Sequence, residues 1–332
     1  MNIIATPIRL RRNRQSEAIR SLIRETELRA SDLIAPLFLI EGCNQKSKIV
    51  SMPGIERLSI DLAIQEAEHL HDKGIQAVLL FPFVDRSLKS LTAEEAWSPD
   101  GLIARAIRRF KEAIPSLCVM ADVALDPYTT HGHDGLVNER GEILNDETIE
   151  CLIRMALVYG ESGVNFVAPS DMMDGRVRAI RSALDKAQFE KVGILAYSVK
   201  YASSLYGPYR EAVNSRVTFG DKKTYHMDPA NVREALLEAA LDQEEGADML
   251  MIKPASLYLD VIAKLREKTK RPIAAYHVSG EYSMVMAAHQ MGWLDAEKVF
   301  YETLLGIKRA GADMILTYAI KHVLDSCKAV LH

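Results

Sequence analysis

An alternation of short apolar runs with longer amphipathic segments constrains this chain more than any other feature. Continuous apolar runs of this kind predict strands that are buried on both faces. Eight runs occur, at Leu33–Ile40, Ala77–Phe83, Cys118–Leu125, Gly163–Ser170, Gly193–Lys200, Ala247–Pro254, Pro272–Gly280 and Ala312–Ala319. Amphipathic helices are predicted between most of them, at Ile60–Lys73, Gly101–Ala113, Asn145–Glu161, Arg176–Lys191, Asn231–Glu245 and Leu257–Thr269.

This alternation predicts a parallel sheet, because parallel neighbours need crossover connections that helices supply. Eight strand–helix units in 332 residues predict the α/β class and a (β/α)8 TIM barrel. A doubly wound open sheet is the alternative, but no GxGxxG motif follows the first strand. Glycines placed just before several strands fit helix C-caps, at Gly74, Gly163, Gly246 and Gly311.

Composition excludes several classes of protein. The chain is 48% hydrophobic and 26% charged, with 41 basic and 45 acidic residues and a net charge of −4, which is ordinary for a globular protein and unlike a disordered chain. A net acidic chain argues against a dedicated nucleic-acid binder, and the apolar runs are too short to span a bilayer. Four scattered cysteines and no visible secretory signal predict reduced thiols and a cytoplasmic location.

Residues 1–30 lie outside the barrel pattern and form a basic segment. Its arginines are Arg9, Arg11, Arg12, Arg14, Arg20, Arg24 and Arg29. Such an arm can bind RNA or pack on a neighbouring subunit, and the net acidic chain favours the subunit contact. We therefore predict an N-terminal arm at residues 1–30 and a catalytic barrel at residues 31–332.

Two predicted strands end in lysine, at Lys200 and Lys253. Functional side chains of a (β/α)8 barrel lie at the C-terminal ends of its strands. These lysines end consecutive strands, which lie about 4.8 Å apart, so their ammonium groups would repel each other by roughly 3 kcal/mol. We expect this repulsion to lower one pKa towards about 8, with burial lowering it further. A neutral amine can attack a ketone, so the pair suits Schiff-base chemistry; snorkelling of each lysine to solvent is the alternative.

A long connection at about residues 201–226 follows Lys200 and is rich in glycine, tyrosine and basic residues. We predict an active-site lid there, with Arg210 and Lys222 binding a substrate carboxylate. A basic and aromatic RNA surface, or a solvated loop, would explain the same composition. At the ends of the last two strands, Ser279 and Tyr318 carry hydroxyls that suit either a carboxylate or a structural hydrogen bond.

The segment Asp122–Gly135 begins at the end of the third predicted strand and carries three aspartates and two histidines. Asp122, Asp126 and Asp134 offer oxygen ligands, which favour Mg²⁺ or a monovalent cation over a thiolate-bound zinc. Asx-turns and caps in a polar loop explain the composition equally well.

Taken together, these motifs closely resemble the porphobilinogen synthase family, also called the 5-aminolevulinate dehydratases. The resemblance covers essentially the full chain and rests on Asp122–Gly135, Tyr197–Ser203, Met251–Pro254 and Tyr276–Glu281 in this order. It implies a TIM barrel whose arm wraps a neighbour in a homo-octamer. It also implies a lyase that joins two 5-aminolevulinate molecules into porphobilinogen, with loss of two waters, on the route to haem and other tetrapyrroles.

The resemblance assigns roles to the residues already singled out. It implies that Lys253 forms a Schiff base with the propionate-side substrate and Lys200 with the acetate-side substrate. The acetate-side carboxylate would then be held by Arg210 and Lys222. The other carboxylate would be held by Ser279 and Tyr318.

The metal ligands depart from one branch of this family. Zinc-dependent relatives carry cysteines where this chain has Ala124, Asp126 and Asp134, so no catalytic zinc and no organic cofactor are expected. The resemblance is to the magnesium-responsive, aspartate-rich branch, in which an allosteric Mg²⁺ outside the active site contacts a glutamate matching Glu238. A monovalent cation or Mg²⁺ at Asp126 and Asp134 is a further expectation.

Two other functions compete with this one. A class I aldolase would need only one Schiff-base lysine, and an RNA-binding protein would use the arginine-rich arm and the basic lid.

Overall fold

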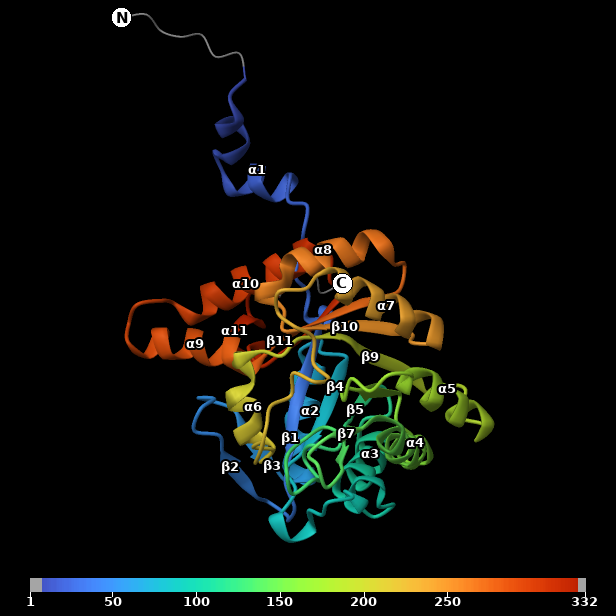
Figure 1. Ribbon diagram of the computed structural model, residues 1–332. Helices are drawn as coiled ribbons and strands as arrows, with labels where there is room; N and C mark the ends of the chain where they lie inside the picture. The colour runs from blue at the N-terminus through green and yellow to red at the C-terminus, as the bar shows by residue number, and fades with distance from the viewer. Residues whose placement is uncertain (1–7, 328–332) are drawn as a thin grey trace, which may run out of the picture.

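The computed structural model describes residues 8–327 and contains a closed barrel of eight parallel strands (Figure 1). In spatial order, each strand is hydrogen-bonded to the next, and β12 pairs with β1 to close the ring. The barrel strands are β1 (Leu33–Leu39), β4 (Ala77–Pro82), β5 (Cys118–Val123), β8 (Phe166–Pro169), β9 (Gly193–Lys200), β10 (Met249–Lys253), β11 (Ile273–His277) and β12 (Met314–Thr317). The predicted (β/α)8 barrel is therefore confirmed.

Helices surround the barrel and cover the outer face of its strands. Because both faces are covered, strands such as β4 are buried at every position, which explains their continuous apolar sequence. The longer helices are α2 (Ile60–Asp72), α3 (Leu102–Ala113), α4 (Asn145–Glu161), α5 (Arg176–Lys186), α7 (Arg233–Glu245), α8 (Leu259–Lys268), α9 (Ser279–Gln290) and α10 (Ala296–Ala310). Short α11 (Ile320–Val323) follows β12.

Several predicted boundaries differ from the observed ones by a few residues. The helix predicted to end at Lys191 ends at Lys186, because Gln188 adopts a left-handed conformation with φ 65°. The strand predicted over Pro272–Gly280 ends at His277, and Ser279 is the first residue of α9. The glycine caps are as expected, since Gly246 and Gly311 have φ of 111° and 122°, which side chains disfavour.

Short pairs of strands decorate the barrel. The hairpin of β2 (Lys46–Lys48) and β3 (Glu56–Leu58) continues the sheet beyond β1, and β6 (Leu136–Val137) pairs with β7 (Ile143–Leu144) in the loop after β5. These additions lie at the C-terminal side of the barrel strands that they follow, where the loops build the site.

The predicted lid has more regular structure than expected. A 3-10 turn at Ser204–Tyr206 leads into α6 (Gly207–Ala212), which packs against α9. At the far end of the lid the chain returns to β9, because Met227 donates its backbone N–H to the Lys200 carbonyl at 3.0 Å. Both ends of the lid are therefore anchored beside Lys200.

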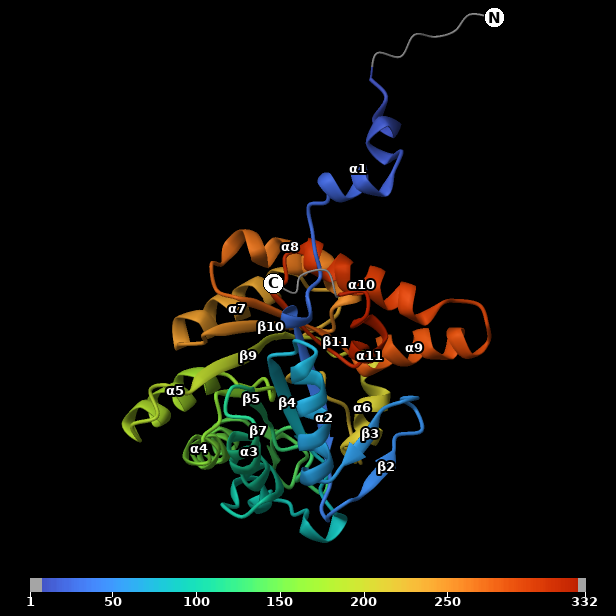
Figure 2. The same cartoon turned by 180° about the vertical axis from the view of Figure 1, so that it is seen from behind.

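The N-terminal arm leaves the barrel and extends away from it in both views (Figures 1 and 2). It contains a 3-10 turn at Leu10–Arg14 and α1 (Glu17–Leu22), in which the Leu22 side chain is 86% exposed. Leu28 is buried, so the chain joins the barrel core close to the predicted boundary at residue 30. Among residues 8–327, no helix is both long and apolar enough to cross a membrane.

Candidate active site

Lys200 and Lys253 are the last residues of β9 and β10 and are register partners across the two strands. Both lie at the C-terminal mouth of the barrel, and they are only 4% and 5% exposed. Neither lysine reaches solvent, so snorkelling does not explain them. The structure brings the two predicted Schiff-base residues together.

Lys253 lies among aromatic rings. Its Nζ lies 4.7–5.2 Å from the ring centroids of four tyrosines, Tyr197, Tyr206, Tyr209 and Tyr276. Burial, and after it the charge of Lys200, together lower the pKa of Lys253 to about 7. The sequence analysis took repulsion between the two lysines as the first cause of a lowered pKa, but burial is the larger one. Lys253 therefore supplies a neutral amine near neutral pH.

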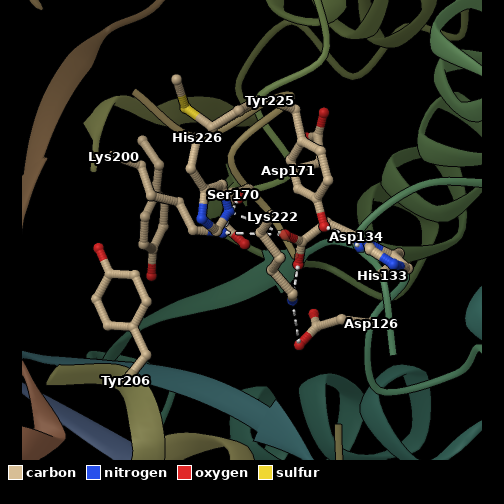
Figure 3. Close-up of polar contacts among 12 residues, drawn as sticks. Asp126, His133, Asp134, Ser170, Asp171, Lys200, Tyr206, Lys222, Tyr225 and His226 are labelled. Carbon is tan, nitrogen blue, oxygen red and sulfur yellow. Dashed lines mark hydrogen bonds and ion pairs between the residues drawn. The ribbon is translucent and has the colours of Figure 1, made fainter. Parts of the chain in front are cut away.

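Lys200 has polar partners instead. Its Nζ donates a hydrogen bond to the carbonyl of Ser170 and lies 3.6 Å from Oδ2 of Asp134 (Figure 3). Lys200 thus has a carboxylate and a carbonyl as neighbours where Lys253 has tyrosine rings, so the two lysines occupy unlike environments. Sequence spacing alone did not distinguish them.

Lys222 reaches from the lid into the same site, between two aspartates (Figure 3). Its Nζ lies 3.1 Å from Oδ1 of Asp134 and 3.8 Å from Oδ2 of Asp126. Burial alone would raise the pKa of Asp134, but Lys200, Lys222 and His226 together hold it well below its usual range. Burial raises the pKa of Asp126 despite Lys222. The two carboxylates predicted to bind a cation thus share a lysine ammonium.

Asp122 is the penultimate residue of β5 and is buried. Burial and the nearby charge of Asp126 raise its pKa to about 7, against the opposing effect of Lys253 and Lys200. Its Oδ1 has no hydrogen-bond partner within residues 8–327. A carboxyl group with a pKa near neutrality beside a lysine suits proton transfer, a role that the sequence alone did not indicate.

A cavity joins these groups. It is lined by Asp126, Asp134, Ser170, Lys200, Tyr206, Tyr209, Arg210, Lys222, His226 and Lys253. Arg210 therefore lines the cavity from α6, as Lys222 does from the lid. The lining combines basic side chains with acidic and phenolic ones, which suits a substrate with both a carboxylate and an amine.

Ser279 and Tyr318 do not line this cavity. The Ser279 hydroxyl accepts the backbone N–H of Tyr209 at 3.0 Å and donates to the carbonyl of Leu205 at 3.3 Å. Tyr318 bonds through its hydroxyl to Tyr276, one of the rings around Lys253. Ser279 thus contacts the lid, and Tyr318 contacts one of the tyrosine rings around Lys253.

Glu238 lies outside the barrel on α7. Its Oε1 is 3.7 Å from Nη1 of the buried Arg176, and it lines a separate cavity with Glu234, Asn145 and Asp174. Burial raises the pKa of Glu238 to about 7, although Arg176 opposes this. No group of three or more His, Cys, Asp or Glu side chains arranged to hold a metal ion occurs within residues 8–327.

Sequence reasoning missed the tyrosine rings around Lys253 and the histidine beside Lys200. The signal for the rings was present, because Tyr206 and Tyr209 lie in the lid and Tyr197 and Tyr276 in apolar strands. His226 gave no signal, since only the return of the lid to β9 brings it to the cavity.

A closed (β/α)8 barrel with two buried lysines side by side at its C-terminal mouth defines an enzyme that reacts with carbonyl substrates through Schiff bases. A family model described as delta-aminolevulinic acid dehydratase matches residues 7–326. The chain belongs to the delta-aminolevulinic acid dehydratase family. It is a lyase with porphobilinogen synthase activity, as the sequence predicted.

Individual relatives agree along almost the whole chain. The chain is 51% identical to delta-aminolevulinic acid dehydratase of Chlamydia pneumoniae, over 98% of each chain. It is 52% identical to the Bradyrhizobium diazoefficiens protein of that name, over 94% of this chain and 88% of that one. A crystal structure of the Toxoplasma gondii enzyme with its product porphobilinogen superposes with a TM-score of 0.95, at 49% identity, covering 98% of this chain and 92% of that one.

Proposed function

We propose that the two lysines divide the porphobilinogen synthase reaction between them, with Lys253 binding the propionate-side 5-aminolevulinate and Lys200 the acetate-side molecule. The register pairing of Lys200 with Lys253 carries this proposal. Each amine adds to a ketone and expels water, which gives an iminium that withdraws electrons from the neighbouring carbon. Loss of a proton there allows the C–C bond to form, and the free amine of one substrate closes the ring.

Proton movement in this scheme falls to Asp122. Asp122 titrates near neutrality and lies electrostatically coupled to both lysines. It can therefore accept a proton during carbon deprotonation and return it when a lysine leaves. The phenols of Tyr197 and Tyr276 have strongly raised pKa values because of burial, so they stay protonated around Lys253.

The substrate carboxylates bind on opposite sides of the lysines. Arg210 and Lys222 line the cavity and suit the acetate-side carboxylate. Ser279 and Tyr318 suit the other carboxylate once the lid shifts, because the Ser279 hydroxyl must redirect its hydrogen from the Leu205 carbonyl to the substrate. This exchange would couple binding at Lys253 to the position of α6.

Borohydride reduction with 5-aminolevulinate, followed by peptide mass analysis, tests the two-lysine assignment. We expect adducts on Lys200 and Lys253, and near-complete loss of turnover in separate Lys200→Ala and Lys253→Ala variants. Near-normal turnover of either variant would favour a single-lysine mechanism of the aldolase type and reject the assignment.

Metal use is proposed to be regulatory. Glu238 is a half-buried carboxylate beside a cavity that includes Glu234, and Mg²⁺ retains most of its waters, so one protein carboxylate can suffice. Bound there, Mg²⁺ would supply charge that stabilises the surrounding loops. In the active site, the Lys222 ammonium already bridges Asp126 and Asp134, which leaves little need for a monovalent cation or Mg²⁺ between them.

Titration with Mg²⁺ and zinc chelation test this proposal. Turnover should rise with Mg²⁺ in the wild type and stop rising in Glu238→Gln, whereas Glu244→Gln, an exposed carboxylate on α7, should respond like the wild type. Activity should survive a zinc-selective chelator, because Ala124, Asp126 and Asp134 offer no thiolate. Activity restored only by zinc would contradict the proposal.

Assembly into a cytoplasmic homo-octamer is also proposed. The arm carries exposed apolar side chains at Leu10, Leu22 and Ile23 beside its arginines, which fits contact with another copy of the chain. Sedimentation should show an octamer for the full chain and smaller species when residues 1–29 are removed. Steeply salt-dependent RNA binding by the arm would instead favour a nucleic-acid partner.

A further inference from the structure

His226 is a buried histidine in the active-site cavity without an assigned role. It lies at the end of the lid, where two backbone hydrogen bonds fix the chain relative to Lys200 and Lys222. Its own N–H donates to the Lys222 carbonyl at 2.8 Å, and the next residue, Met227, donates to the Lys200 carbonyl at 3.0 Å. The fold therefore locks this imidazole between Lys200 and Lys222.

Within residues 8–327, the imidazole of His226 makes one polar contact, to the Asp134 carboxylate that Lys200 and Lys222 share (Figure 3). Its Nε2 lies 3.0 Å from Oδ2 of Asp134. The Asp134 carboxylate lies against the ammonium groups of Lys200 and Lys222 and accepts hydrogen bonds, so Nε2 of His226 is the donor. A hydrogen on Nδ1 would be buried without an acceptor among residues 8–327, so the ring is neutral and Nδ1 holds a lone pair.

Aromatic contacts hold the ring in this orientation. The Tyr225 ring packs edge-on at a centroid distance of 4.9 Å and the Tyr206 ring at 6.3 Å. Nδ1 is buried and has no hydrogen-bond partner within residues 8–327. The ring is thus fixed by packing, and its Nε2–H is committed to Asp134.

We propose that His226 is a positioning residue that holds the Asp134 carboxylate so that Oδ1 faces Lys222 and Oδ2 faces Lys200. A neutral donor suits this task, because a third cation would weaken the attraction of Asp134 for each lysine. Without the His226 N–H, the Asp134 carboxylate can rotate so that it contacts Lys222 alone. Lys200 is then no longer oriented towards the acetate-side substrate. Lys253, which lies among tyrosine rings, does not depend on this contact.

This inference rests on the proposed role of Lys200. Trapping at Lys200 and Lys253 separately distinguishes the role of His226 from the role of Lys200. Borohydride trapping with 5-aminolevulinate should give adducts on both lysines of the wild type. In His226→Leu the ratio of Lys200 to Lys253 adduct should fall about tenfold, the effect of losing a hydrogen bond to a charged group. In His226→Gln, whose amide N–H can replace Nε2–H, the ratio should stay within about threefold of the wild type.

A structural control is provided by His277, a buried histidine that bonds Thr317 at 3.0 Å and does not line the cavity. His277→Leu should lower the thermal midpoint without changing the adduct ratio. An unchanged ratio in folded His226→Leu would overturn the positioning role, whereas a wild type without any Lys200 adduct would overturn the proposed function itself.

A measurement on the wild type covers the case in which His226→Leu does not fold. Neutron diffraction from crystals of the full chain should show deuterium on Nε2 of His226 and none on Nδ1. The opposite tautomer would leave Asp134 without this donor and would reject the inference.

Discussion

Lys253 and Lys200 are register partners on adjacent strands, yet Lys200 pairs with Asp134 while Lys253 lies among four tyrosine rings. The same residue type at equivalent positions is thereby placed in two electrostatic environments. Burial among rings favours a neutral amine at Lys253, whereas the Nζ of Lys200 is held by polar partners. The pair can therefore react with two identical substrates in different ways.

The first prediction concerns the pH dependence of Lys253. Its lowered pKa means that the protonated form is lost as pH rises through about 7, so adduct formation at Lys253 should rise with pH and level off above that value. Peptide-resolved borohydride trapping at a series of pH values measures this. Replacing the neighbouring charge, in Lys200→Met, should move the midpoint upwards. A wild-type midpoint near that of a free lysine would contradict the burial argument.

The second prediction concerns the Lys222 ammonium between Asp126 and Asp134. Lys222→Met leaves two buried carboxylates without their bridging cation and should destabilise the fold by about 3 kcal/mol. Urea unfolding measures the loss. Combining Lys222→Met with Asp126→Asn removes one carboxylate charge and should restore part of the stability. A double variant less stable than Lys222→Met would argue against charge as the cause.

The third prediction concerns Arg176, a fully buried arginine that bonds both oxygens of Asp242 at 3.2 and 3.3 Å and lies 3.6 Å from Asp171. Arg176→Met leaves both buried carboxylates unpaired and should destabilise the fold by about 3–5 kcal/mol. Thermal unfolding measures this. Lys298→Met, which removes an exposed pair with Asp295, should leave the midpoint unchanged. Equal midpoints for the two variants would show that the buried network contributes nothing.

The fourth prediction concerns Ser279, which accepts the Tyr209 amide and so ties α9 to the lid. Ser279→Ala removes this acceptor and also the hydroxyl that would bind the substrate. KM should therefore rise roughly 5-fold, with a smaller change in kcat. Steady-state kinetics measure both constants. Ser283→Ala, on the same helix but bonded to the Ser51 carbonyl, should leave both constants near wild type. A fall in kcat alone would place Ser279 in the chemical step instead.

The sequence by itself determined the barrel. Eight apolar runs separated by amphipathic helices admit few arrangements, because buried parallel strands need helical crossovers that return on the same side. The sequence also placed Lys200 and Lys253 at the ends of consecutive strands, since both end apolar runs. Boundaries were less certain where a turn residue such as Gln188 overrides helical periodicity.

Only the tertiary structure decided what surrounds each lysine. Tyr276 and Tyr209 come from a strand and the lid, and they meet Lys253 only after the barrel closes. His226 reaches Asp134 across 92 residues of sequence, because the lid returns to β9. The local sequence pattern indicates which residues are buried. The pKa of a buried group depends on the charges and rings that surround it, and segments distant in the sequence supply those neighbours.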